Sequence, residues 1–255
     1  MTTAAVILDW LARAGTVIAL VSWIIVFVRR RVRRTRVQRF FGGGRVDVLL
    51  PLRTLDDRAA VSVPDFMTGL ALQRFLTKFG VDIRFRFLRP EDSLHLETPG
   101  TVVVCGPKNS PEVNAAMRRD PVLAFSEDAR GWTLEAAGVR YRSKSDAGEA
   151  HGADDATHSD IGYLSRTVER IGGDSERVVI WIAGVHAPGS AIVADRLCRT
   201  RSIRRARRLA PSGRFSAVIG GTYSANPLRV RTSQKLFFAA HPERPGGSTR
   251  VPAAP

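Results

Sequence analysis

The sequence predicts an α/β protein that has a transmembrane helix at its N-terminus, followed by a three-layer domain with a mostly parallel central sheet. Three observations lead to this fold class. A long apolar segment near the N-terminus runs directly into a block of arginines. Beyond that block, short apolar runs typical of buried strands alternate with patterns of helical spacing. Two of these runs end in a glycine-containing loop that opens a helix, as strands of a parallel sheet do.

Length and composition fit one membrane anchor and one globular domain. The 255 residues are 44% hydrophobic and 25% charged, which are ordinary values for a chain that buries a core. The net charge of +15 comes mainly from arginine, and such use of arginine reflects a GC-rich coding genome as readily as a nucleic acid partner. We therefore do not expect nucleic acid binding. The two widely spaced cysteines fit a reducing compartment, in which both remain thiols.

Residues 1–28 are predicted to form the transmembrane helix. Residues 14–28 carry no charge, and extending the segment upstream to Ala4 gives about 25 residues, enough to cross a bilayer as a helix. The two charges within the extension, Asp9 and Arg13, lie four residues apart and can pair on one helix face. The alternative, a buried helix of a soluble protein, is disfavoured because such a helix is seldom apolar on every face.

Residues 29–45 are predicted to form a basic stem that ends in a flexible glycine linker. Seven of the eleven residues from 29 to 39 are arginine: Arg29, Arg30, Arg31, Arg33, Arg34, Arg36 and Arg39. A dense cationic block resists translocation, so we expect a single-pass protein of the cell membrane with its N-terminus outside and its remaining chain in the cytoplasm. The same arginines are expected to bind anionic headgroups, which makes residues 4–39 the predicted lipid contact. A cleavable signal peptide would show the opposite order of charge and apolar residues.

Residues 46–240 are predicted to form the cytosolic α/β domain. Apolar runs and alternating patterns predict strands at 46–52, 83–88, 101–105, 122–125, 139–142, 160–169, 215–221 and 228–232, and another that begins at residue 178. Helical spacing predicts a helix over 65–79, capped by Asp65, and two further helices that begin near Ser110 and Ser190. Residues 144–159 are expected to form a mobile surface loop and residues 241–255 a disordered tail.

Two loops of this domain form the candidate ligand site. In an open parallel sheet, ligands bind beyond the carboxyl ends of the strands. Both loops combine glycine, which allows close approach of the backbone, with a serine at a predicted helix start, where free N–H groups favour a phosphate. The candidate ligand-binding residues are Gly106, Lys108, Asn109, Ser110, Gly184, His186, Gly189 and Ser190.

Lys108 supplies a positive charge to this site, Asn109 can bind a ribose or a base edge, and His186 can bind phosphate or carry a proton. Neither loop has the spacing of a P-loop or of a complete G-x-G-x-x-G motif. The alternative interpretation is that the glycines only allow tight turns and that Ser110 and Ser190 only cap helices.

The arrangement resembles Rossmann-like nucleotide-binding domains over residues 46–235. It is also similar to an actinobacterial family of membrane-anchored domains that have a CGPK-type loop, a DIGYL-type strand and an AGxHxxGS-type loop. These motifs stand here at residues 105–108, 160–164 and 183–190. The resemblance implies a Rossmann-like sheet and a nucleotide-type ligand, and it implies no particular activity.

Other residues offer weaker candidates for catalysis. Cys105 ends a predicted strand and could act as a nucleophile with His186 as its base. Asp160 or Glu127 could supply a carboxylate for hydrolysis, although no spacing distinguishes them from surface acids.

No metal site is expected, because the cluster His151, Asp154, Asp155 and His158 lies in a predicted mobile loop without a rigid scaffold. The basic run 199–208, if helical, could lie on an anionic membrane face or touch nucleic acid. The simpler interpretation of this run is a solvated helix.

These features favour a membrane-tethered cytosolic module that binds a nucleotide or another phosphorylated small molecule in a sensor or regulatory role. The first alternative is an enzyme that hydrolyses or transfers such a ligand. The second is a scaffold or partner-binding membrane protein without a small-molecule site. The sequence names no cofactor, and it leaves open a protein partner or a homo-oligomer.

Overall fold

The structure is a computed structural model of the 255-residue chain. It describes the backbone of residues 3–55, 58–94, 96, 98–144, 157–170 and 176–242, and, within these ranges, the side chains from residue 20 onward except those of residues 54, 55 and 170. The predicted tail beyond residue 242 and most of the predicted loop 144–159, with His151, Asp154 and Asp155, lie outside the described residues. His158 is described, and its ring stacks on Tyr223 with 5.4 Å between centroids.

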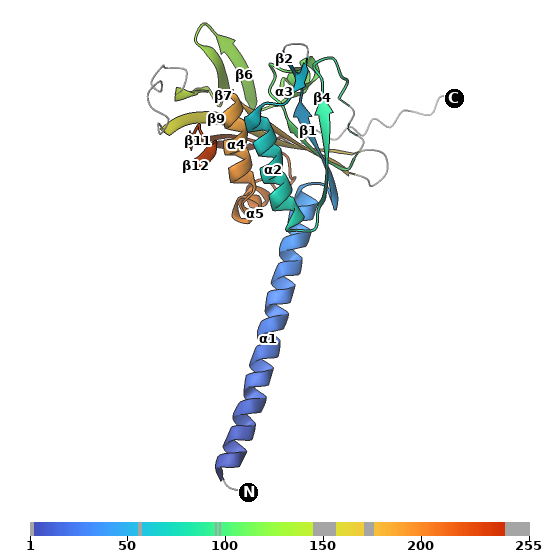
Figure 1. The fold of residues 1–255 in the computed structure, drawn as a ribbon, viewed down its shortest axis with the longest axis vertical. Coiled ribbons are helices and arrows are strands. Elements are labelled where there is room, and N and C mark those ends of the chain that lie inside the picture. The colour runs from blue at the N-terminus through green and yellow to red at the C-terminus, as the bar shows by residue number, and fades with distance from the viewer. Residues whose placement is uncertain are drawn as a thin grey trace, which may run out of the picture.

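A seven-stranded mixed sheet forms the centre of the domain (Figure 1). Its strands, in spatial order, are β12 (Arg229–Ala240), β11 (Phe215–Ser224), β9 (Thr157–Arg170), β10 (Glu176–Gly184), β5 (Gly100–Val104), β1 (Arg45–Pro51) and β4 (Asp82–Leu88). Strands β4, β1, β5 and β10 are parallel, whereas β9 is antiparallel to both neighbours and β12 is antiparallel to β11. Because β11 therefore points the same way as β10, the sheet is mostly parallel. The predicted α/β class is confirmed, and the sheet is Rossmann-like at a coarse level.

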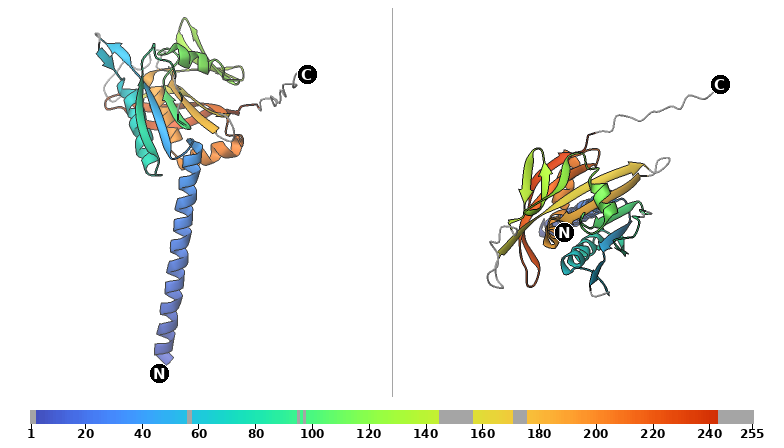
Figure 2. Two further views of the ribbon diagram at one scale, coloured as in Figure 1. Left: turned by 90° about the vertical axis from the view of Figure 1, so that its right-hand side faces the viewer. Right: turned by 90° about the horizontal axis from the view of Figure 1, so that it is seen from above.

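The two faces of the sheet carry different layers (Figure 2). Helices α2 (Val63–Thr77), α4 (Ala187–Leu197) and α5 (Thr200–Leu209) cover one face. The short helix α3 (Pro111–Met117) and a small antiparallel sheet of β6 (Leu123–Asp128), β7 (Gly131–Ala136) and β8 (Val139–Arg142) cover the other. A two-stranded hairpin of β2 (Arg53–Leu55) and β3 (Arg58–Ala60) precedes α2. Strand β7 was not predicted from the sequence.

Strand β10 shows why the sequence of a central strand is a continuous apolar run. Val178, Ile180 and Ile182 belong to the core beneath the helices, whereas Val179 and Trp181 belong to the core beneath α3 and the small sheet. Side chains alternate between the two faces of a strand, so a strand covered on both sides needs apolar residues at every position.

Helix α1 (Thr3–Phe40) has 38 residues and projects from the domain along most of its length (Figure 1). At 1.5 Å per residue it is about 57 Å long. The side chains of residues 1–19, and with them the predicted pairing of Asp9 with Arg13, lie outside the described residues. Among the residues that the structure does describe, no helix is both long enough and apolar enough to cross a membrane.

The last turn of α1 is part of the domain core. Val37, Phe40 and Phe41 are each at most 2% exposed and pack in the core beneath the helices. Arg166 lies across this helix end, where its Nε donates to the carbonyl of Phe40 at 2.9 Å and its guanidinium lies 5.0 Å from the Phe40 ring centroid. The core therefore begins before residue 46, the predicted start of the domain.

The glycine run that the sequence predicted as a flexible linker begins with a packed turn at Gly42. Gly42 has φ +93°, and a Cβ on it would lie 2.5 Å from the carbonyl oxygen of Pro99. The amide of Gly43 donates to the carbonyl of Gln38 at 2.8 Å, which ends the helix. Glycine is needed at residue 42 for left-handed backbone and close packing, whereas a Cβ on Gly43 or Gly44 would meet no atom within 4 Å. Close packing at Gly42 argues against a joint at that residue, and the flexible joint stays a prediction for Gly43 and Gly44.

Candidate functional site

The two predicted loops lie side by side at the carboxyl-terminal edge of the sheet, where its parallel strands end. They follow β5 and β10, which are parallel neighbours, so their carboxyl ends meet. The Nζ of Lys108 in the first loop donates to the carbonyl of Val185 in the second at 3.1 Å. The sequence indicated each loop separately, and the structure brings them together.

This edge faces away from α1. Helix α1 ends at Phe40 and β1 begins at Arg45, so the starts of the parallel strands lie near α1 and their carboxyl ends lie at the opposite end of the domain. Helix α3, which follows the first loop, accordingly lies at the end remote from α1 (Figure 1). A ligand at this edge would be separated from α1 by the length of β1, about 23 Å at 3.3 Å per residue.

The first loop combines a structural serine with two accessible polar groups. The buried Ser110 is the N-cap of α3, and its Oγ accepts from the amide of Val113 at 3.4 Å. The side chain of Lys108 is exposed, and its amine also lies 5.3 Å from the Trp132 ring centroid. Asn109 is half-buried. The capping interpretation therefore holds for Ser110, which leaves Lys108 and Asn109 as the groups that could meet a ligand.

The second loop is tightly packed. A Cβ on Gly184 would lie 1.8 Å from the carbonyl oxygen of His186, and a Cβ on Gly189 would lie 2.3 Å from that of Ile161. Helix α4 begins at Ala187 with His186 as its N-cap, three residues before the predicted start. The hydroxyl of Ser190 is buried and accepts from the amide of Gly184 at 3.1 Å. The glycines therefore allow close backbone packing in this turn, and the hydrogen bond of Ser190 stabilises it.

A buried carboxylate, Asp160 on β9, lies at the start of α4. One of its oxygens accepts from the amide of His186 at 3.3 Å, and the other accepts from the amide of Ile161 at 2.8 Å and lies 3.4 Å from Nδ1 of His186. Asp160 is only 2% exposed, whereas the side chain of His186 is 38% exposed. The carboxylate thus places a negative charge at the positive end of the helix dipole, where the sequence predicted a phosphate.

The predicted nucleophile is in an unsuitable environment. Cys105 is buried, and burial raises the pKa of its thiol to about 12. The thiol is therefore protonated at neutral pH, and its Sγ donates to the carbonyl of Gly106 at 3.4 Å. Glu127, the other predicted carboxylate, is exposed on β6 in the small sheet. Only the imidazole and carboxylate of His186 and Asp160 remain as a candidate acid–base pair at this edge.

No metal site was expected, and the described residues contain no group of three or more histidine, cysteine or acidic side chains that could hold a metal ion. Of the four residues that resemble a ligand cluster in sequence, only His158 is among those described.

Sequence reasoning missed a buried polar cluster on the other side of β9. Asp120 accepts from the hydroxyl of Tyr163 at 2.7 Å and from that of Ser216, and Ser216 Oγ lies 2.8 Å from Nε2 of His241. Desolvation lowers the pKa of His241 and raises the pKa of Tyr163 well above its usual value. Ser216 is completely buried, so its contact with the imidazole is inaccessible to a substrate and is structural.

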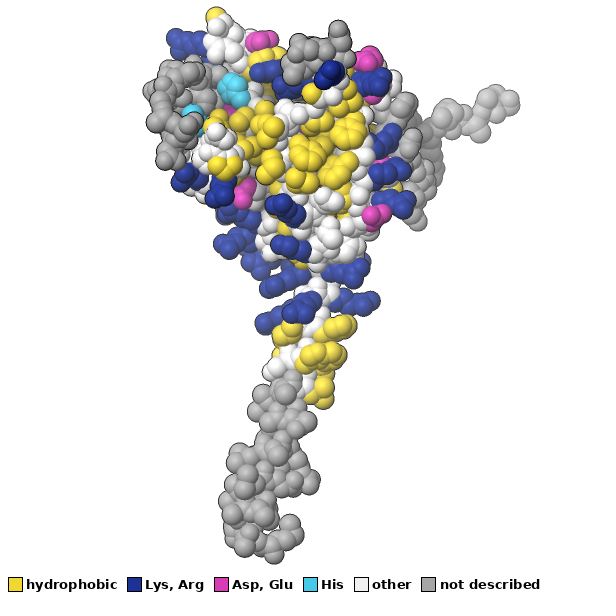
Figure 3. Space-filling model, in the orientation of Figure 1, with side chains coloured by type: hydrophobic (Ala, Val, Ile, Leu, Met, Phe, Trp, Pro, Cys, Tyr) yellow, Lys and Arg dark blue, Asp and Glu magenta, His cyan; other side chains and the backbone are white. Residues whose placement is uncertain are grey.

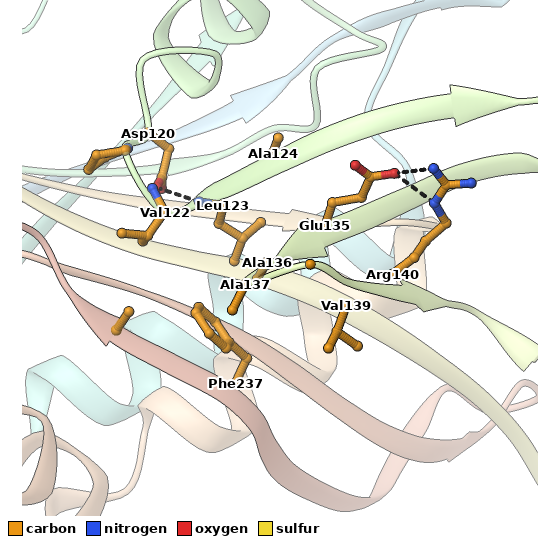
Figure 4. Close-up of a pocket in the computed structure, with 13 residues that line it drawn as sticks. Asp120, Val122, Leu123, Ala124, Glu135, Ala136, Ala137, Val139, Arg140 and Phe237 are labelled. Carbon is orange, nitrogen blue, oxygen red and sulfur yellow. Dashed lines mark hydrogen bonds and ion pairs between the residues drawn. The ribbon is translucent and has the colours of Figure 1, made fainter.

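The members of this cluster are far apart in the chain and follow no spacing rule, and His241 falls where the sequence predicted a disordered tail. In the structure the His241 ring is only 6% exposed. Beside the cluster lies an open groove of about 670 Å³ between the small sheet and β12. Figure 4 shows Asp120 at one end of this groove, the ion pair of Glu135 and Arg140 at the other, and Phe237 along its floor.

A second candidate surface lies on α1. Eight of the nine residues from 20 to 28 are large and hydrophobic, and their exposed fractions all fall between 44% and 63%. We call residues 20–28 the apolar shaft, and the seven arginines of residues 29–39 the arginine collar. Figure 3 shows hydrophobic side chains along α1 and dark-blue basic side chains between them and the domain. The predicted basic run 199–208 forms α5, and its residues contact the collar end of α1.

Comparison with known proteins adds no assignment to either surface. No family model, no curated protein and no solved structure matches this chain. What the two surfaces do must therefore be inferred from their own residues: the edge formed by Lys108, Asn109, His186 and Asp160, and the shaft with its collar.

Proposed function

We propose that this chain is a single-pass protein of the cell membrane whose α/β domain lies on the cytoplasmic side. We further propose that the domain binds a nucleotide or another phosphorylated small molecule at the sheet edge remote from α1, in a sensor or regulatory role. The observation that carries the proposal is the apolar shaft, which is exposed on every side and continues directly into the arginine collar.

The shaft supports anchoring because each of its large hydrophobic side chains is at least 44% exposed. An apolar side chain of this size gains roughly 1.5–3 kcal/mol when it leaves water completely. The exposed fractions are similar around the whole helix, as expected for a segment surrounded by lipid rather than packed on one face. The collar supports the proposed orientation because closely spaced arginines are retained on the cytoplasmic side.

A topology measurement tests the proposed anchor and its orientation. With a tag fused after Pro255, we expect labelling only in permeabilised cells, and we expect the chain to stay in the membrane fraction after carbonate extraction. A variant that replaces Ile24 and Phe27 with Asp should move into the soluble fraction, since charges within a hydrocarbon core are costly. Labelling of the tag in intact cells would overturn the orientation, and carbonate-soluble wild-type chain would overturn the anchor.

The ligand part is supported by the position and chemistry of the sheet edge. Two loops meet at the carboxyl ends of parallel strands, and the exposed Lys108 side chain spans them. Because Asp160 disfavours a phosphate directly at α4, we propose that the phosphate lies on the side of Lys108 and Asn109, with His186 as a further donor. Because this edge lies about 23 Å from the α1 end of β1, the ligand is a water-soluble molecule rather than a lipid headgroup.

Nucleotide binding by the full-length chain in zwitterionic nanodiscs tests the ligand part. We expect saturable binding to at least one member of a nucleotide panel. Lys108→Gln should weaken it tenfold or more, because a hydrogen bond to a charged group contributes about 1.5–3 kcal/mol. Lys78→Gln, which changes an exposed lysine at the end of α2, is the matched control and should bind normally. Absence of binding across the panel, or equal losses in both variants, would reject the site.

Two alternatives have an observation in their favour. The pairing of the exposed His186 ring with buried Asp160 favours an enzyme, and turnover of the bound nucleotide would identify one. A patch of Val63, Phe66 and Met67 on α2 with Phe87 on edge strand β4, each at least 36% exposed, favours a partner-binding protein. Figure 3 shows hydrophobic side chains gathered over this part of the domain.

A further inference from the structure

A cavity of about 220 Å³ lies between the collar end of α1 and helix α5. Arg33 and Arg36 line it from α1, and Arg201 and Arg204 line it from α5. Its apolar floor is formed by Val37 and Ile203, each 1% exposed. Because these floor residues belong to the domain core, the four arginines are held on a fixed support rather than on a free helix.

The charge of this cavity is uncompensated. No acidic residue lines it, and among the described residues none of the four arginines takes part in an ion pair. Asp195, in the last turns of α4, is paired with Arg199 at 2.5 Å. Four guanidinium groups around one space repel one another, and an anion with several oxygens would relieve that repulsion through charge-assisted hydrogen bonds.

The depth of the cavity along α1 matches the headgroup layer. Arg33 lies five residues and Arg36 eight residues beyond Val28, the end of the apolar shaft. These separations correspond to about 7.5 Å and 12 Å along a helix. A bilayer's polar layer extends roughly 5–8 Å beyond its hydrocarbon core on each side. If the shaft ends at the hydrocarbon boundary, the cavity therefore opens at or just beyond the phosphate groups.

We propose that this cavity is a binding site for the phosphate of one anionic phospholipid in the cytoplasmic leaflet. The inference rests on the proposed membrane anchor and deepens it. Planar guanidinium groups bind phosphate oxygens in pairs, and two such groups come from each helix. The volume corresponds to about seven water molecules, which accommodates a phosphate and its ester oxygens. The bound lipid joins α5 to the leaflet.

Lipid titration of the full-length chain tests this site. The chain is placed in phosphatidylcholine nanodiscs that contain increasing phosphatidylglycerol, and native mass spectrometry counts the phosphatidylglycerol molecules that remain bound. We expect one retained lipid in the wild type. Arg33→Gln with Arg204→Gln should weaken its retention a hundredfold or more, because each arginine that is removed takes with it a charge-assisted hydrogen bond to the phosphate of about 1.5–3 kcal/mol.

The matched control is Arg30→Gln with Arg208→Gln, which removes the same charge from the same two helices outside the cavity. The loss of lipid retention in this control should be at least tenfold smaller than the loss in the cavity variant. Equal losses of retention in the two variants would indicate a diffuse charge effect and would overturn the site. Displacement of the lipid by an equal concentration of pyrophosphate would also overturn the phospholipid site, and would indicate a site for a soluble anion instead. A wild-type chain that fails to enter the nanodisc overturns the anchor itself, so the two failures are distinguishable.

Discussion

Asp160 joins β9 to the start of α4 and lies where the sequence predicted a phosphate. Its carboxylate accepts from two backbone amides and lies beside the ring of His186, all in a position that is 2% exposed. A carboxylate in this position stabilises the helix terminus and compensates its dipole. The same contacts orient His186, so a single residue links the stability of the loop to the only candidate acid–base group at the edge.

Replacing this carboxylate should destabilise the fold measurably. Asp160→Asn keeps the shape of the side chain but removes the charge, so we expect the free energy of unfolding to fall by about 1–3 kcal/mol. The measurement is urea unfolding of the full-length chain at a fixed detergent concentration. Glu127→Gln, at an exposed acid on β6, is the control and should stay within about 0.5 kcal/mol of the wild type. An unchanged stability in Asp160→Asn would show that the carboxylate does not hold α4.

At the scale of secondary structure, local patterns located most elements of the domain. The alternation of IRFRFL predicted β4, and the apolar run before Gly106 predicted β5, because side-chain direction along a strand depends on neighbouring residues only. Helix α2 is shifted by two residues, since Ser62 rather than Asp65 is the N-cap. Asp65 instead lies three residues after the cap, where its side chain bonds the serine hydroxyl at 2.5 Å.

What sequence patterns could not provide is the placement of one element against another. Strand β9 pairs with β10, the next strand in the chain, but also with the distant β11, and nothing local to these strands encodes that second pairing. The start of α4 was misplaced because Ser190 resembles an N-cap, whereas its hydroxyl bonds back to Gly184 across the turn. The cluster of Asp120, Ser216 and His241 was missed for the same reason, as its contacts exist only in the folded sheet.

At the scale of the whole molecule, the junction between α1 and the domain is rigid. The guanidinium of Arg166 bonds the carbonyls of Phe40 and Arg39 at the end of α1 and that of Gly213 beyond α5. Burial lowers the pKa of Arg166 to about 10, so the group is still charged at neutral pH. A positive charge at this helix end is favourable because the carbonyl dipoles of α1 point toward it. The orientation of the candidate ligand site relative to α1 is therefore set by the core rather than by a linker.

Removing Arg166 should loosen this junction and lower stability together. Arg166→Met keeps the apolar contact with Phe40 but leaves buried carbonyls without their donor, and each such group costs about 1–3 kcal/mol. We expect faster hydrogen exchange at the amides of residues 37–44 in nanodiscs, together with a lower free energy of unfolding. Arg74→Met, at an exposed arginine on α2, controls for loss of charge and should leave both unchanged. Exchange at residues 37–44 as slow as in the wild type would show that the buried guanidinium contributes nothing to the junction. The packing of Phe40 and Phe41 alone would then hold α1 against the domain.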